Sequence, residues 1–114
     1  MRTATGALLD PPIRDLVAVR LRELVGHAVT EVRITRVRWD ESKRWVVMLL
    51  DERLPGSRRE LPVDRGGLHH LVAILIRDAF PHADWSRAQD YDVVHGALRE
   101  HVVRVPAALA GDAL

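Results

Sequence analysis

Residues 45–50 read WVVMLL, and this short run decides which kind of sheet the chain can build. Successive side chains of a β-strand point to opposite faces of its sheet. One face would therefore carry Trp45, Val47 and Leu49, and the other Val46, Met48 and Leu50. A strand that is apolar on both faces is typical of a sheet that is covered on both sides. We therefore expect a helix of the same chain, or a second chain, to cover each face.

Two further strands are predicted beside this run, which lies in a strand over residues 44–54. Residues 30–39, TEVRITRVRW, alternate apolar and polar side chains, and a change of phase at Thr35–Arg36 predicts a β-bulge. Residues 58–63, RRELPV, form a short third strand. Turn-forming residues separate the three runs, at Asp40–Lys43 and again at Pro55–Ser57. The pattern predicts an antiparallel meander.

Three helices complete the predicted fold. The first spans residues 10–26, where Asp10 is a candidate N-cap and Gly26 a candidate C-terminal stop. The second spans Asp64–Phe80 and carries a wide apolar surface, and the third spans Ser86–Arg104. The predicted fold class is α+β, a small three-stranded antiparallel meander with one helix before it and two after it (αβββαα).

The length of 114 residues is close to the commonest size of a single domain. We predict one α+β domain over residues 10–105, a flexible N-terminus over residues 1–9 and a flexible C-terminal tail over residues 106–114. No apolar run approaches the roughly 18 residues that a membrane span needs, and the N-terminus lacks the apolar core of a signal peptide. These features predict a cytoplasmic protein that does not bind membranes.

Cysteine and charge content exclude several classes of function. The chain has no cysteine, which excludes disulfides, thiolate nucleophiles and cysteine-ligated zinc. The net charge of +1 gives no strong overall field toward DNA or an anionic membrane. All of the 17 basic residues except Lys43 are arginine. We attribute this bacterial-like, arginine-rich composition to a GC-rich genome.

The histidines lack the spacing of a metal site. Two ligands on one helix face are three or four residues apart, whereas His69 and His70 are adjacent and His95 and His101 are six apart. No residue is assigned as catalytic or metal-binding, and no cofactor is expected. The remaining small-ligand hypothesis is a pocket lined by His69, Tyr91, Asp92 and His95.

Arginines near the strands offer a nucleic-acid hypothesis. Residues 31–59 hold eight basic and five acidic side chains, and Trp39 and Trp45 flank the first turn, where aromatic rings can stack on bases. The DRGG sequence at residues 64–67 offers backbone N–H groups to an anion at a helix start. The candidate nucleic-acid or anion contacts are Arg33, Arg36, Arg38, Arg44, Arg58, Arg59 and Arg65.

The sequence favours a non-catalytic protein-interaction or accessory subunit of the adaptor, chaperone-like or immunity type. It would act as a homodimer or with another protein, through the apolar surface of Val46, Met48 and Leu50. The first alternative is a nucleic-acid-binding module that uses the arginine-rich sheet. The second is an enzyme or small-ligand binder that uses histidine and aspartate side chains.

Overall fold

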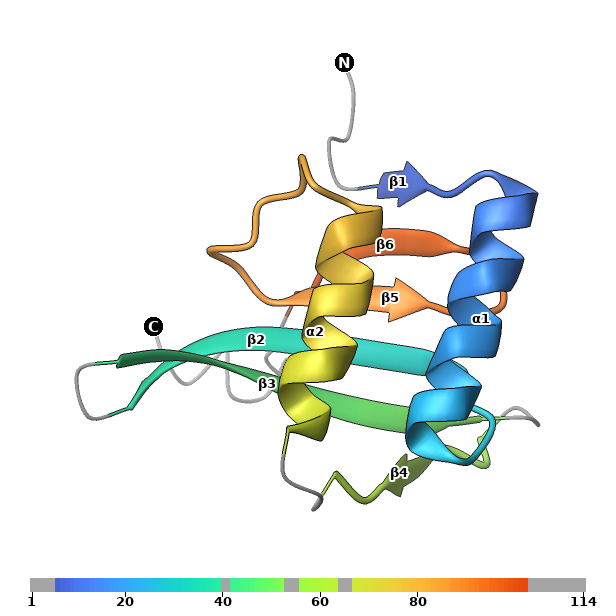
Figure 1. Cartoon of the computed structure of the whole chain (residues 1–114), viewed down its shortest axis with the longest axis horizontal. Coiled ribbons are helices and arrows are strands. Elements are labelled where there is room, and N and C mark those ends of the chain that lie inside the picture. The colour runs from blue at the N-terminus through green and yellow to red at the C-terminus, as the bar shows by residue number, and fades with distance from the viewer. Residues whose placement is uncertain (1–5, 40–41, 53–55, 64–66, 103–114) are drawn as a thin grey trace, which may run out of the picture.

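The computed structural model describes residues 6–39, 42–52, 56–63 and 67–102 of the chain. Six strands form one antiparallel sheet, and two helices lie side by side across one of its faces (Figure 1). Along the chain the elements are β1 (Gly6–Leu8), α1 (Pro11–Val25), β2 (Glu31–Trp39), β3 (Ser42–Asp51), β4 (Arg59–Leu61), α2 (Leu68–Ala79), β5 (Gln89–Asp92) and β6 (Ala97–Glu100). Across the sheet, the strands follow the order β1-β6-β5-β2-β3-β4.

The predicted meander is present but forms only half of the sheet. Strand β3 pairs with β2 on one side and with β4 on the other, as the sequence indicated. The prediction of a three-stranded sheet is nevertheless wrong, because β5 pairs with the other side of β2 and β6 and β1 extend the sheet from there. The αβββαα order is therefore replaced by βαβββαββ.

The third predicted helix, Ser86–Arg104, is wrong because this segment forms β5, a turn and β6. The carboxylate of Asp92 accepts a hydrogen bond from the backbone N–H of His95, which fixes the start of the turn. Gly96 then adopts a left-handed conformation with φ 67°, a conformation that favours glycine. Helical spacing had grouped apolar residues across this turn, although Gln89–Asp92 alternates buried and half-buried residues with the period of a strand.

The first two helices match their predicted positions closely. Helix α1 has prolines in its first turn and ends at Gly26, whose backbone N–H bonds the carbonyl of Arg22 at a left-handed φ of 83°. Asp10 occupies the N-cap position but makes no side-chain capping bond. Helix α2 begins at Leu68, and residues 64–66 of its predicted first turn lie outside the described residues.

The predicted bulge at Thr35–Arg36 is also wrong. Register between β2 and β3 is continuous, from the pair Glu31–Leu50 to the pair Trp39–Ser42. Arg36 lies on the same side of the sheet as Val32 and Ile34. This end of the hairpin, however, projects beyond the helices (Figure 1). A side chain on the helix face therefore stays exposed there, which explains the apparent change of phase in the sequence.

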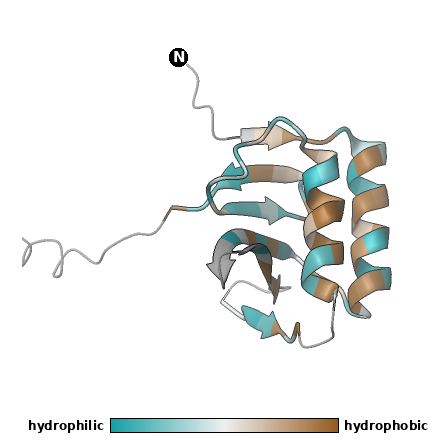
Figure 2. Cartoon of the chain, turned by 60° about the vertical axis from the view of Figure 1, so that its left-hand side comes forward, coloured by the Kyte–Doolittle hydropathy of each residue, from teal (hydrophilic) through white to brown (hydrophobic). Residues whose placement is uncertain are grey.

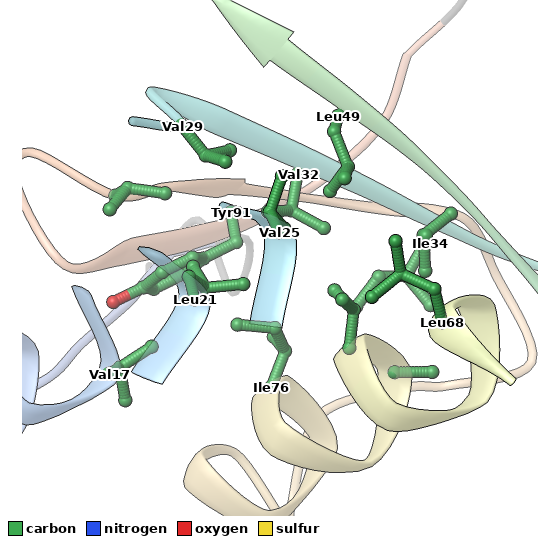
Figure 3. Packing of buried hydrophobic residues seen from close by; sticks show 14 of the residues in the cluster. Val17, Leu21, Val25, Val29, Val32, Ile34, Leu49, Leu68, Ile76 and Tyr91 are labelled. Atoms are coloured by element: carbon green, nitrogen blue, oxygen red, sulfur yellow. The ribbon is translucent and has the colours of Figure 1, made fainter. Parts of the chain in front are cut away.

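The hydrophobic core lies between the helices and the sheet. Leu98, Tyr91, Val32 and Leu49 oppose one another in register across four neighbouring strands. Leu21 and Val25 of α1 and Ile76 of α2 point down onto this row (Figure 3). Val47 and Leu49 of β3 face this core and are buried in it. One of the two apolar sides predicted for this strand is therefore covered by helices of the same chain.

Candidate functional site

Strand β3 presents its second apolar side to the open face of the sheet. Both helices lie on the other face (Figure 2), and no described helix or strand covers the face that carries Val46 and Met48. Val46 is 41% exposed, and Met48 is half-buried. Leu50, the third residue of the predicted interface, is 5% exposed and is already buried by its own chain. We call Val46 and Met48 the β3 strip.

The same part of β3 has an open edge. Strand β4 has three residues and pairs only with Leu49, Leu50 and Asp51. Nearer the start of β3, the described part of the chain provides no strand on that side. The backbone N–H of Val47 points out from this edge and donates to Nδ1 of His69 at 3.0 Å. An unpaired strand edge is a ready template for another extended segment.

A groove joins the open edge to the β3 strip. It has a volume of about 530 Å³ and continues beyond the end of β4. Its lining consists of Val46, Val47, Met48, Glu60, Leu61, Pro62, Val63 and His69. Apolar side chains thus lie beside a stretch of β3 that pairs with no described strand on this side, which is the combination that strand-adding partners use for affinity and specificity.

The rest of the open face carries a network of ion pairs. Asp90 of β5 lies at its centre, 2.8 Å from Nε of Arg33 and 2.8 Å from Nδ1 of His101. Glu31 of β2 bonds Arg58 at 3.0 Å and lies 3.8 Å from Arg33. These charges satisfy one another, so this half of the face is compatible with contact with water. The open face is therefore divided into a charged half on β2, β5 and β6 and an apolar strip on β3.

An acidic pocket lies at one end of the charged half. It has a volume of about 450 Å³ and brings together the carboxylates of Glu31, Glu52, Asp90 and Asp92, with His95 and Arg99 beside them. Asp92 bonds the imidazole of His95 at 2.7 Å. Within the described residues, no group of three or more histidine and carboxylate side chains has the geometry to hold a metal ion.

The predicted ligand pocket of His69, Tyr91, Asp92 and His95 is not assembled as one site. Asp92 and His95 line the acidic pocket, whereas His69 lines the groove beside β3. Tyr91 points into the core between the sheet and the helices (Figure 3), and its hydroxyl is buried with no hydrogen-bond partner among the described residues. Burial raises the pKa of Tyr91 to about 12, and the nearby charge of Asp92 contributes to this shift.

The candidate nucleic-acid contacts do not form one surface. Arg33, Arg58 and Arg59 are paired with carboxylates of Asp90, Glu31 and Asp51. Arg44 is exposed near the β3 strip, whereas Arg36 lies on the helix side of the sheet, where its guanidinium is 6.0 Å from the Trp45 ring. The side chain of Arg38 and all of Arg65 lie outside the described residues.

Trp45 also has a structural role on the helix side. The guanidinium of Arg77 lies over its ring at 4.3 Å, and Trp85 meets it edge-on with the ring centroids 6.2 Å apart. The indole N–H of Trp85 donates to the carbonyl of Phe80, which fixes the loop after α2. This cluster was missed because Arg77 and Trp85 lie 32 and 40 residues after Trp45 in sequence.

Comparisons with known proteins add no assignment. Among the described residues, no helix is long and apolar enough to cross a membrane. No family model, no curated protein and no solved structure matches this chain.

Proposed function

We propose that this protein is a non-catalytic interaction subunit that associates through the β3 strip and the groove beside it. Its partner is a second copy of the chain or another protein. The observation that carries the proposal is the placement of both helices on one face of the sheet, which leaves Val46 exposed and Met48 half-buried on the other, where no described helix or strand lies over them.

The surroundings of the strip support this choice over the alternatives. An exposed apolar surface beside an open strand edge favours contact with another polypeptide. For nucleic acid, several candidate arginines are already neutralised by carboxylates, and Trp45 packs against Trp85 and Arg77. For catalysis, the His101–Asp90 pair is part of the ion network on the open face.

Sedimentation analysis of three proteins tests this proposal. The wild type is compared with Met48→Asp, which places a charge in the strip, and with Val19→Asp, which places the same charge on an exposed apolar residue of α1. We expect association of the wild type and of Val19→Asp at high micromolar concentration, and a folded monomer for Met48→Asp. For a different partner, affinity capture from the native host should recover a protein that Met48→Asp loses and Val19→Asp keeps.

The proposal fails if the wild type stays monomeric and Met48→Asp captures the same proteins as the wild type. Circular dichroism of the three proteins separates this outcome from unfolding of the variant. A change in stability that is equal for Met48→Asp and Val19→Asp, with association intact, also contradicts an interface at the β3 strip.

A further inference from the structure

The contact between His69 and Val47 has an unusual chemistry for a strand edge. The N–H group of a β-strand normally donates to a carbonyl of a neighbouring strand. Here the acceptor is Nδ1 of an imidazole, at 3.0 Å, and that imidazole belongs to the first turn of α2. The bond therefore ties the start of a helix to the open edge of β3, at the position where β4 no longer pairs.

This bond requires one protonation state of His69. An imidazole nitrogen accepts a hydrogen bond only when it carries no proton, so the neutral ring must hold its proton on Nε2. When the ring becomes an imidazolium, both nitrogens are donors and Nδ1 faces the Val47 N–H with a proton of its own. Protonation and the bond to Val47 therefore exclude each other.

We infer that His69 is an acid-sensitive latch, which holds α2 against the open edge of β3 at neutral pH and releases that edge when the imidazole is protonated. The position of the ring strengthens the effect, since a positive charge in the first turn of a helix opposes the helix dipole. Helix α2 begins after Gly67 without a side-chain cap and has no acidic residue in its first turn.

The charged groups around the latch act in both directions. Glu60 of β4 lines the same groove, and its carboxylate favours an imidazolium on His69. Arg44 of β3 and the neighbouring His70 of α2 are exposed, and the positive charge of Arg44 opposes an imidazolium. The bond from Val47 is made only by the unprotonated ring, so proton uptake by His69 and opening of the edge are coupled.

Amide hydrogen exchange of Val47 tests the latch directly. We expect the protection of this amide in the wild type to fall by roughly two- to tenfold between about pH 7.5 and about pH 5, which corresponds to the loss of one hydrogen bond. In His69→Asn, the Oδ1 atom can accept the same bond without titrating, so the protection should not change with pH. The matched control is His70→Asn, which alters an exposed histidine on the same turn and should behave as the wild type does.

An equal pH dependence of Val47 protection in the wild type and in His69→Asn overturns the inference. If His69→Asn does not fold, the wild type alone tests the inference, because Val47 protection that does not change with pH contradicts the latch. Nitrogen-15 chemical shifts of the His69 ring should show the Nε2–H tautomer at neutral pH, and the Nδ1–H tautomer contradicts the latch.

The latch is tested in the isolated protein, whereas any control of partner binding at this edge rests on the proposed function. The two can fail separately. Loss of association in Met48→Asp with no pH effect at Val47 supports the interface and removes the latch. A pH effect at Val47 in a protein that remains monomeric and captures no partner supports only the latch.

Discussion

The two sides of β3 differ in how deeply their side chains are buried, although both sides carry apolar residues. On the helix side, Val47 and Leu49 are buried against α1 and α2. On the open side, Val46 is the most exposed of the strand's apolar residues and Met48 is half-buried. The sequence determined which residues share a side, but the cover of each side depends on elements far away in the chain. The difference indicates that an apolar pattern reports a need for cover and does not identify what provides it.

The strongest test of this comparison places the same charge on neighbouring residues of β3. Val47→Asp buries an unpaired carboxylate in the core and is expected to cost several kcal/mol, enough to prevent folding. Val46→Asp points to the open side and should cost about 1 kcal/mol, because it only exchanges a strand-favouring residue for an unfavourable one. Urea denaturation followed by circular dichroism measures both. Equal losses would show that the open side is also covered within the chain.

A second test applies the same contrast to helix α2. Ile76 is fully buried, whereas Ile74 is 36% exposed. Ile76→Ala should lower the free energy of unfolding by about 2–5 kcal/mol through lost burial and a cavity. Ile74→Ala should lower it by less than about 1 kcal/mol, unless a partner covers this surface. Chemical denaturation at two protein concentrations distinguishes these cases, because only an interface residue gives a concentration-dependent loss.

The ionisation of the Tyr91 hydroxyl reports on burial in the core. Its pKa is raised to about 12 from an ordinary value of 10.0, so the folded protein holds the phenolic proton more tightly than the unfolded chain. This contribution to stability is complete below pH 10 and is lost as the pH rises toward about 12. Tyr91 is the only tyrosine, so ultraviolet absorbance of tyrosinate reports this group alone.

The Tyr91→Phe variant supplies the control for this titration. It removes a buried hydroxyl that bonds none of the described residues, so stability at neutral pH should be unchanged or higher by about 1 kcal/mol. Its alkaline loss of stability should also be smaller than that of the wild type. A normal tyrosinate titration in the wild type would place Tyr91 in contact with water.

The smallest expected effect concerns the charged half of the open face. Asp90→Asn weakens the contacts to Arg33 and His101, whose side chains are about three-quarters buried. We expect a loss of about 1 kcal/mol that decreases with added salt. Glu23→Gln, which removes the exposed pair with Arg20, should have almost no effect. Thermal unfolding at low and high salt compares the two, and an equal response would mean that the network adds no stability.

The local parts of the fold could be predicted from the sequence because their signals are local. Prolines and Gly26 fix the ends of α1, and alternation fixes the sides of β3. Strands β5 and β6 were missed because both are four residues long, and apolar residues on either side of Gly96 coincide with helical spacing. Leu71 shows the same limit on a helix: it belongs to the wide apolar surface predicted for residues 64–80, and it is 49% exposed.

Of the candidate site, the sequence identified the β3 strip but not its surroundings. Val46 and Met48 follow directly from alternation, whereas the bond from Val47 to His69 joins residues 22 positions apart. The ion network likewise joins β2 to β5 across 57 positions. No periodic signal connects such residues, because their proximity depends on the insertion of β5 beside β2.

The order of strands in the sheet also sets the order in which the protein can be completed during synthesis. Strand β1 is the first described strand to be made, yet among the described strands it pairs only with β6, the last of them, in the register Gly6–Arg99 to Leu8–Ala97. Likewise, both edges of β2 are paired only after β5 has been synthesised. A nascent chain that ends after α2 can therefore form the β2–β3–β4 meander while the inner edge of β2 is still open to other chains. The last described strands to be synthesised, β5 and β6, lie inside the sheet and not at its edge, so truncation before β5 should produce an aggregation-prone fragment instead of a smaller stable domain.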